Sequence, residues 1–214
     1  MATAAQKKRR SENLDLLQSP QIQAALVMIS KSEGTFNHST NQIEYGRIVN
    51  GQVLQSPFNP SLVGKTNVVI SDFSRYPQML VRVRAGLNSS AAGGFQVIKN
   101  TWNGAAAAMG ITDFSPLSQQ LVAVELLRQR GAIPYILKND LPGAFANTTL
   151  AKEWASFAGA GYGQGEHSIA KLNGWFQSAL SGVSQVASNV RETIEENPGV
   201  SSAVVVVGVI ALFF

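Results

Sequence analysis

The first stretch of regular hydrophobic spacing along the chain ends at a glutamate. Apolar side chains recur there at i, i+3, i+4 and i+7, which predicts a helix with one buried face: Ile22, Ala25, Leu26 and Ile29. Ser19 and Pro20 are residue types that open a helix, and Gly34 is the type that ends one. Glu33 is therefore expected at the helix C-terminus. There the helix dipole and the apolar surroundings would both raise the pKa of its carboxyl group. Such a group can act as a general acid, whereas the alternative is an ordinary solvated glutamate at a helix end.

The hydrophobic pattern changes after this helix to short segments with polar flanks. The segment 43–49 followed by Asn50 and Gly51 is typical of a strand and a hairpin turn. Residues 68–70 are a further candidate strand, and residues 78–86 are expected to form a short helix. We therefore predict a small antiparallel sheet directly after Glu33.

Later segments carry helical spacing or capping signals, and they run over 97–109, Pro116 to Gly131, 149–157 and 168–196. Trp154 is expected to be buried. The sequence thus predicts an α+β chain, mainly α, with a small antiparallel sheet, followed by an amphipathic helix and a C-terminal apolar segment. We divide it into a basic N-terminal arm (1–18, of which 1–10 are expected to be disordered), a main domain (19–167), an amphipathic helix or linker (168–198) and a hydrophobic C-terminal segment (199–214).

The C-terminal residues 200–214 contain no charged side chain. As a helix this run would be roughly 22 Å long, shorter than the about 30 Å hydrocarbon core of a bilayer. A buried core strand or helix is one interpretation. We favour membrane insertion or tight membrane association, because the run stands alone after a linker and has no alternating polar face.

Composition excludes several kinds of chemistry. The chain has no cysteine, and its two histidines, His38 and His167, lack the spacing of metal ligands, so we expect no thiol nucleophile, no metal site and no cofactor. Residues 48–99 hold five basic side chains against the single acid Asp72, which suits an anionic partner such as nucleic acid, lipid or cell wall, or else a solvated basic face. Basic and aromatic residues are not interleaved, so direct nucleic-acid recognition is not expected. The basic run at 7–10 is not followed by an apolar core, so no signal peptide is expected.

Two loops rich in small residues are candidates for ligand binding. The first, 88–96, ends in Phe95 and Gln96, which would supply an apolar wall and an amide, although a flexible loop opening the next helix is the plainer interpretation. The second, 159–165, lacks the preceding strand and the glycine order of a dinucleotide site, so we reject that function for it.

Several motifs in one order resemble the lambda-type phage endolysins, which are lytic transglycosylases of the lysozyme-like superfamily. The motifs are Ser32-Glu33-Gly34-Thr35, Ser89-Ser90-Ala91-Ala92-Gly93-Gly94-Phe95-Gln96, Asp113-Phe114-Ser115-Pro116-Leu117-Ser118-Gln119, Arg130-Gly131-Ala132-Ile133-Pro134, Trp154-Ala155-Ser156, Gly159-Ala160-Gly161-Tyr162-Gly163-Gln164 and Glu166-His167. They cover about residues 20 to 167. The resemblance implies a lysozyme-like catalytic domain that binds bacterial peptidoglycan.

Carried over residue by residue, the resemblance makes Glu33 the catalytic acid. It makes Ser90, Phe95, Gln96 and Tyr162 candidates for lining the saccharide site. The chain departs from the family at Gly94-Phe95, where the family tends to have Arg-Tyr, so a cationic donor and a phenol are absent from that wall.

The combination of a basic N-terminus and an apolar C-terminal end also resembles the lytic proteins of enveloped double-stranded RNA bacteriophages. This resemblance implies a protein carried in the virion beneath the viral envelope, at the nucleocapsid surface. It would act in the bacterial periplasm at entry and at lysis, and the context would explain both the absent signal peptide and the hydrophobic end.

Four functions are left open by the residues. A hydrolase would need a second carboxylate, for which Glu44 and Asp72 are the candidates, although an Asx-turn is the expected role of Asp72. Since neither carboxylate is convincing, we prefer the transglycosylase route through Glu33 alone. The alternatives are a peptidoglycan endopeptidase on the same fold and a membrane-anchored structural protein of a virion.

Overall fold

The computed structural model describes residues 1–163 and 165–196, and the chain folds as two compact units. The first unit contains residues 1–15 and 44–126, and the second contains residues 16–43 together with the chain from residue 127 onward. The predicted hydrophobic segment 199–214 lies outside the described residues.

The basic N-terminus is a helix, so the prediction of a disordered arm over residues 1–10 is wrong. Helix α1 spans Ala4–Leu17. Its buried Asn13 donates a hydrogen bond of 3.0 Å to the Glu125 carboxylate, which also lies 3.7 Å from the Arg9 guanidinium. These partners are distant in sequence, and the burial of Asn13 among them offsets the entropy cost of ordering the segment.

The sheet of the first unit has three antiparallel strands in the order β3 (Gln52–Gln55), β4 (Leu80–Arg84) and β5 (Leu87–Ser89). The predicted helix over 78–86 is therefore wrong. In β4 the side chains alternate, since Val81 is fully buried and Arg82 is exposed, which is the period of a strand. Gly86, with φ of 75°, supplies the left-handed backbone that the two-residue turn to β5 needs.

The predicted strands at 43–49 and 68–70 are only partly present. Arg47 and Ile48 form isolated bridges with Val69 and Ala92, and residues 50–51 do not join two paired strands. In the second unit, β1 (Phe36–Asn37) pairs with β2 (Gln42–Ile43) directly after the helix Pro20–Ser32. The small antiparallel sheet is thus confirmed, but most of its pairing partners lie further along the chain.

Helical segments complete the first unit. They are the short 3-10 helix η1 (Pro60–Leu62), α3 (Lys99–Met109) and α4 (Pro116–Gln129), whose last residues belong to the second unit. The core contains the rings of Tyr76, Trp102 and Phe114, with 4.6 Å between the centroids of Trp102 and Phe114. Edge-to-face contacts of this kind add about 0.5 to 1.5 kcal/mol each to the burial of the rings.

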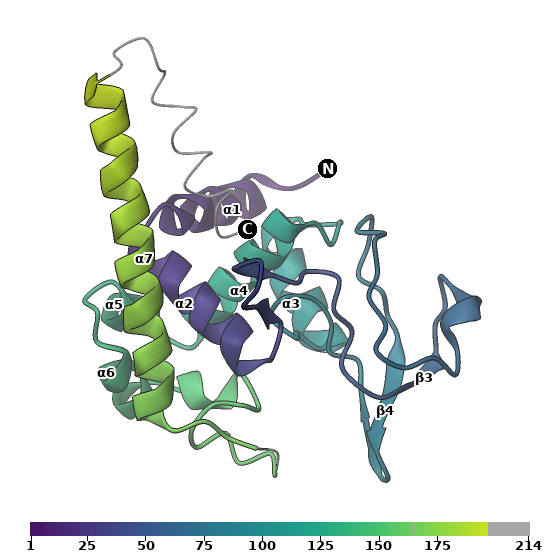
Figure 1. Cartoon of the computed structure of the whole chain (residues 1–214). Helices are drawn as coiled ribbons and strands as arrows, with labels where there is room; N and C mark the ends of the chain where they lie inside the picture. The colour runs from purple at the N-terminus through teal and green to yellow at the C-terminus, as the bar shows by residue number, and fades with distance from the viewer. Residues whose placement is uncertain (164, 197–214) are drawn as a thin grey trace. The chain divides into compact units, whose positions relative to one another are not determined.

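The second unit is built on α2 (Pro20–Ser32) and α7 (Ile169–Glu196), which pack against each other (Figure 1). One face of α7 is buried through Leu172, Phe176, Ala179 and Val183, which confirms the predicted amphipathic helix. Full burial of a large apolar side chain contributes about 1.5 to 3 kcal/mol, so this face holds α7 on the unit.

The rest of the second unit is short helices, namely α5 (Ile133–Ile136), α6 (Leu141–Asn147) and the 3-10 helix η2 (Leu150–Lys152). The predicted helix over 149–157 is present only as η2, although Trp154 is buried as expected. Among the described residues, no helix has the length and apolar character needed to cross a membrane.

Candidate active site

Glu33 is the residue that ends α2. Its backbone N–H still donates to the carbonyl of Ile29, while Gly34 takes a left-handed conformation with φ of 68°. The chain then turns back, and both the N–H and the hydroxyl of Thr35 donate to the carbonyl of Ser30, at 2.9 and 3.1 Å. This turn fixes Glu33 at the C-terminal end of the helix, as the sequence predicted.

The Glu33 side chain is half-buried, and its carboxyl group has a close polar partner in the same unit. The hydroxyl of Ser156 donates a hydrogen bond of 2.6 Å to its Oε1 atom. Burial raises the pKa of Glu33 to about 7, although the hydrogen bonds from the side chain and the backbone of Ser156 act in the opposite direction. The group is therefore protonated in an appreciable fraction of molecules near neutral pH, and it also has an accessible ionised form.

Ser156 sits in a firmly held segment of the same unit. Its carbonyl accepts a hydrogen bond of 2.8 Å from the N–H of His167. The neighbouring rings of Trp154 and Phe157 are buried, with 5.1 Å between their centroids. These contacts hold the segment that carries the Ser156 hydroxyl beside Glu33.

Sequence reasoning did not select Ser156 as a site residue. It lies in the Trp154-Ala155-Ser156 motif, but nothing in the motif states which distant group the hydroxyl contacts.

The second glycine-rich loop of the same unit carries Tyr162, which is 56% exposed and donates its hydroxyl to the carbonyl of Lys152 at 3.0 Å.

This loop is held by ionised groups at both of its sides. The Glu166 carboxylate accepts hydrogen bonds from the N–H groups of Gly159 and Gly161, at 2.8 and 2.7 Å, and these bonds lower its pKa. The Lys152 ammonium donates to the carbonyls of Gly159 and Ala160, at 2.9 and 3.0 Å. These bonds hold residues 159–161, and the exposed phenol of Tyr162 that follows them suits stacking against a ligand.

The other predicted lining residues belong to the first unit. Ser90 accepts a hydrogen bond of 3.0 Å from the N–H of Lys99, and its carbonyl accepts one from the Tyr76 hydroxyl. The side-chain amide of Gln96 donates to the carbonyls of Arg47 and Gly93, at 3.2 and 2.8 Å. Both side chains therefore shape the loop around residues 88–96 through hydrogen bonds.

Phe95 is placed differently from the expectation. Its side chain is 1% exposed and packs edge-to-face on Tyr45, with 6.1 Å between the ring centroids. A ring buried in this way belongs to the core of the unit and presents no face to a ligand. Phe95 therefore does not supply the expected apolar wall, because its ring is packed into the core beside Tyr45.

Both candidates for a second carboxylate lie in the first unit and have local partners. Glu44 forms an ion pair with Arg47. The exposed Asp72 accepts a hydrogen bond of 2.9 Å from the N–H of Ser74, and this bond, with the Ser74 hydroxyl and nearby Arg75, lowers its pKa. Asp72 thus forms the Asx-turn that the sequence indicated. Over the described ranges, His, Asp and Glu side chains do not gather in threes as a metal site would require.

A mainly helical chain with small antiparallel sheets and a glutamic acid of raised pKa at a helix end is a protein of the lysozyme-like class. Its fold is similar to bacteriophage lambda lysozyme complexed with a chitohexasaccharide, with a TM-score of 0.62 and 32% identity over 75% of this chain and 94% of that one. A second structure of lysozyme from bacteriophage lambda gives a TM-score of 0.58 at 31% identity, with the same coverage of both chains.

The sequence comparisons agree with this fold. The endolysin of Escherichia phage lambda is 33% identical over 168 residues, which cover 78% of this chain and 95% of that protein. The endolysin of Escherichia phage P2 is 37% identical over 157 residues, covering 71% and 87%. The family model described as Endolysin matches residues 23–183. The chain therefore belongs to the endolysin family, and it is a phage lytic enzyme that degrades peptidoglycan. The predicted lambda-type resemblance and lysozyme-like fold are confirmed.

Proposed function

We propose that this endolysin cleaves the glycan strand of peptidoglycan as a lytic transglycosylase, with Glu33 as its single acid and base. The observation that carries the proposal is the carboxyl group of Glu33, held at a helix end with a pKa of about 7 and hydrogen-bonded by Ser156. A group that must first give a proton and then take one works best when its pKa lies near the working pH.

In the first step, protonated Glu33 donates its proton to the glycosidic oxygen between N-acetylmuramic acid and N-acetylglucosamine. The bond from the anomeric carbon to that oxygen breaks, and N-acetylglucosamine leaves with a new hydroxyl group. In the second step, the Glu33 carboxylate takes the proton from the C6 hydroxyl of the muramic residue. The C6 oxygen then bonds to the anomeric carbon, which gives a 1,6-anhydro product and restores the protonated acid without consuming water.

The contacts of the two candidate second carboxylates, Glu44 and Asp72, support the transglycosylase route over hydrolysis. A hydrolase of this class needs a second carboxylate, about 5 to 9.5 Å from the acid, which acts as nucleophile or activates water. Glu44 is paired with Arg47, and Asp72 is held in its own turn. A single-acid mechanism requires neither of them.

The proposed ligand is a strand of N-acetylated sugars, in keeping with the chitohexasaccharide bound to the similar lambda lysozyme. The exposed Tyr162 is proposed to contact the strand, and Ser90 and Gln96 are proposed to shape the loop that borders it. Phe95 acts from the core, as a support for that loop.

Mass spectrometry of the fragments released from purified peptidoglycan tests the proposal. We expect muropeptides that end in 1,6-anhydro-muramic acid from the native chain and none from Glu33→Gln. Reducing muramic ends would instead indicate hydrolysis, with Glu44 or Asp72 as the second carboxylate. Intact glycan strands with freed peptide ends would indicate an endopeptidase, and fragments of any kind from Glu33→Gln would contradict the role of Glu33.

We further propose that the protein is carried in a virion and associates with a membrane through residues 199–214, reaching peptidoglycan in the periplasm. The support is the uncharged run at 200–214 in the sequence. Flotation of the full chain with lipid vesicles tests this, compared with Val205→Asp. We expect the native chain to float with the vesicles and the variant to remain below, whereas equal distribution of both would contradict a membrane role for this segment.

A further inference from the structure

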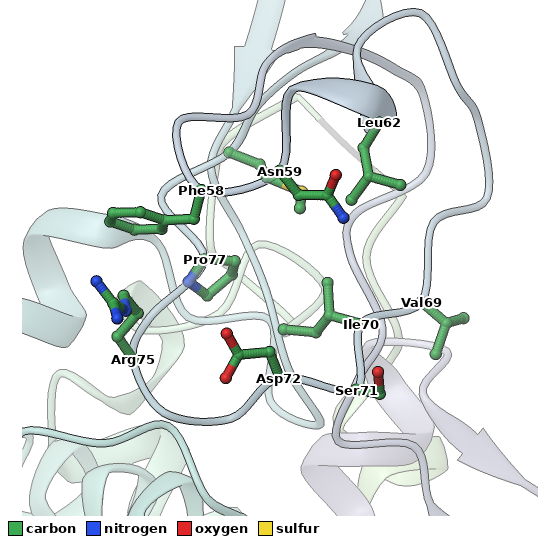
Figure 2. Close-up of a pocket in the computed structure, with 10 residues that line it drawn as sticks. Phe58, Asn59, Leu62, Val69, Ile70, Ser71, Asp72, Arg75 and Pro77 are labelled. Carbon is green, nitrogen blue, oxygen red and sulfur yellow. The ribbon is translucent and has the colours of Figure 1, made fainter.

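A pocket of about 200 Å³ lies in the first unit, between the segment 58–62 and the segment 69–79 (Figure 2). Its lining combines apolar side chains with one cation and one carboxylate, and it includes Phe58, Leu62, Ile70, Asp72, Arg75 and Met79. The residues proposed for acid catalysis and for the border of the glycan strand do not line it. The mechanism therefore gives this pocket no role.

The cation of the pocket is held in place by an aromatic ring. The Arg75 guanidinium carbon lies 4.8 Å from the centroid of the Phe58 ring, and Phe58 remains 48% exposed. A cation over an aromatic face gains about 0.5 to 1 kcal/mol at an exposed site. This contact orients the guanidinium and leaves its N–H donors available for a planar anion such as a carboxylate.

The carboxylate of the pocket is also oriented. The N–H of Ser74 donates to one oxygen of Asp72, and Figure 2 shows the Asp72 carboxylate between Arg75 and Ile70. Asp72 and Arg75 are both exposed, so a ligand can reach the two charges from solvent. Buried Met79 and the half-buried Leu62 and Ile70 supply an apolar floor beside them.

Opposite charges beside a small apolar floor fit a short peptide better than a neutral sugar. In an intact strand the sugars carry no charge for a guanidinium to pair with, because the lactyl carboxyl group of each muramic residue is amide-linked to its stem peptide. The stem peptides of peptidoglycan carry free carboxylates, the ammonium group of a diamino acid, and alanine methyl groups. The basic excess of residues 48–99 complements the negative charge of these peptides.

We propose that the pocket between 58–62 and 69–79 binds the stem peptide of the substrate strand, with Arg75 pairing a peptide carboxylate and Asp72 pairing the diamino-acid ammonium group. This inference rests on the proposed function, because the stem peptide is attached to the proposed substrate. It makes the enzyme selective for strands that still carry their peptides.

The test compares cleavage of intact peptidoglycan with cleavage of the same material after an N-acetylmuramoyl-L-alanine amidase has removed its stem peptides. The native chain is expected to have a kcat/KM up to about fivefold higher on the intact strands, because an ion pair between exposed groups contributes at most roughly a factor of five. Arg75→Gln is expected to bring the ratio of the two values close to one. Asp72→Asn keeps the acceptor for the Ser74 N–H, and it is expected to lower the ratio in the same direction.

The matched control is Arg82→Gln, which removes one exposed positive charge from β4 of the same unit, outside the pocket. It is expected to keep the native ratio. Stripped strands retain a carboxylate on each lactyl group, so the two materials differ in the peptide and not simply in the presence of a negative charge. A native ratio near one would show that the pocket does not bind the peptide and would overturn the inference. An equal loss of preference in Arg75→Gln and Arg82→Gln would also overturn it, because general charge would then be the cause.

Binding provides a readout that does not depend on cleavage. Sedimentation of Glu33→Gln with intact and stripped peptidoglycan measures the same preference, and adding Arg75→Gln to it is expected to abolish the preference. If the native chain cleaved the glycan strand in neither material, that result would contradict the proposed function. Equal sedimentation with both materials would contradict the peptide pocket, so the two failures are distinguishable.

Discussion

Replacing Ser156 by alanine removes a short side-chain hydrogen bond to Glu33, 2.6 Å from hydroxyl to carboxylate oxygen. That bond favours the ionised form of the carboxyl group, so its loss raises the pKa of Glu33 further above its present value of about 7. A hydrogen bond to a charged group contributes about 1.5 to 3 kcal/mol, and one pKa unit corresponds to about 1.4 kcal/mol. We therefore expect an upward shift of the pKa by about one to two units.

Activity as a function of pH reports this shift directly. Donation of the first proton requires the protonated acid, so activity falls on the alkaline side as Glu33 ionises. In Ser156→Ala the alkaline limb of kcat/KM is expected to move up by about one to two pH units, together with a lower maximum because the carboxyl group loses its orientation. Release of soluble muropeptides, measured between pH 5 and pH 9, provides the profile.

Two variants control for a general loss of structure. Ser156→Thr keeps a hydroxyl and should restore the native profile. Ser181→Ala removes an exposed hydroxyl that donates to a backbone carbonyl on α7, and it should leave the profile unchanged. An alkaline limb that stays in place in Ser156→Ala, or moves to lower pH, would refute the idea that this bond sets the pKa of Glu33.

Three further outcomes concern stability, each measured by chemical denaturation. Folding raises the pKa of Glu33 from 4.5 to about 7, so the free energy of unfolding falls as pH rises through that range. Glu33→Gln should therefore increase the free energy of unfolding by up to about 3 kcal/mol at pH 8 and leave it unchanged at pH 4. An equal effect at both pH values would contradict the raised pKa of Glu33. Phe176→Ala leaves a cavity on the buried face of α7 and should cost about 3 to 5 kcal/mol, against a negligible cost for exposed Gln177→Ala. Asn13→Ala removes a buried donor to Glu125 and should cost about 1 to 3 kcal/mol, with a cost near zero arguing against an ordered N-terminal helix.

Local patterns were sufficient wherever the structure depends on neighbours in sequence. The end of α2 at Glu33 follows from the apolar spacing before it and the glycine after it, and both are read within one or two turns of helix. The amphipathic helix α7 and the Asx-turn at Asp72 are local in the same sense. These features needed no knowledge of distant partners.

The errors arose where distant contacts decide the outcome. The basic N-terminus is ordered by Glu125, and β4 is a strand because it pairs with both β3 and β5. The alternation of Val81 and Arg82 was a usable signal for β4, but it is short and lies between a proline and a glycine that also fit a helix. Phe95 was expected beside a ligand because its position in a motif does not reveal which way the ring turns.

The pKa of Glu33 illustrates why its partner had to come from elsewhere in the fold. Burial alone would raise the pKa further and keep the carboxyl group protonated, and such a group is a weaker acid for the first step. A fully solvated carboxyl at a helix end would be ionised, with no proton to give. The hydroxyl of Ser156 opposes the effect of burial, and the pKa settles at about 7, where both forms are populated. A residue that serves first as acid and then as base needs both forms, so the single-acid mechanism depends on a contact between residues 123 positions apart.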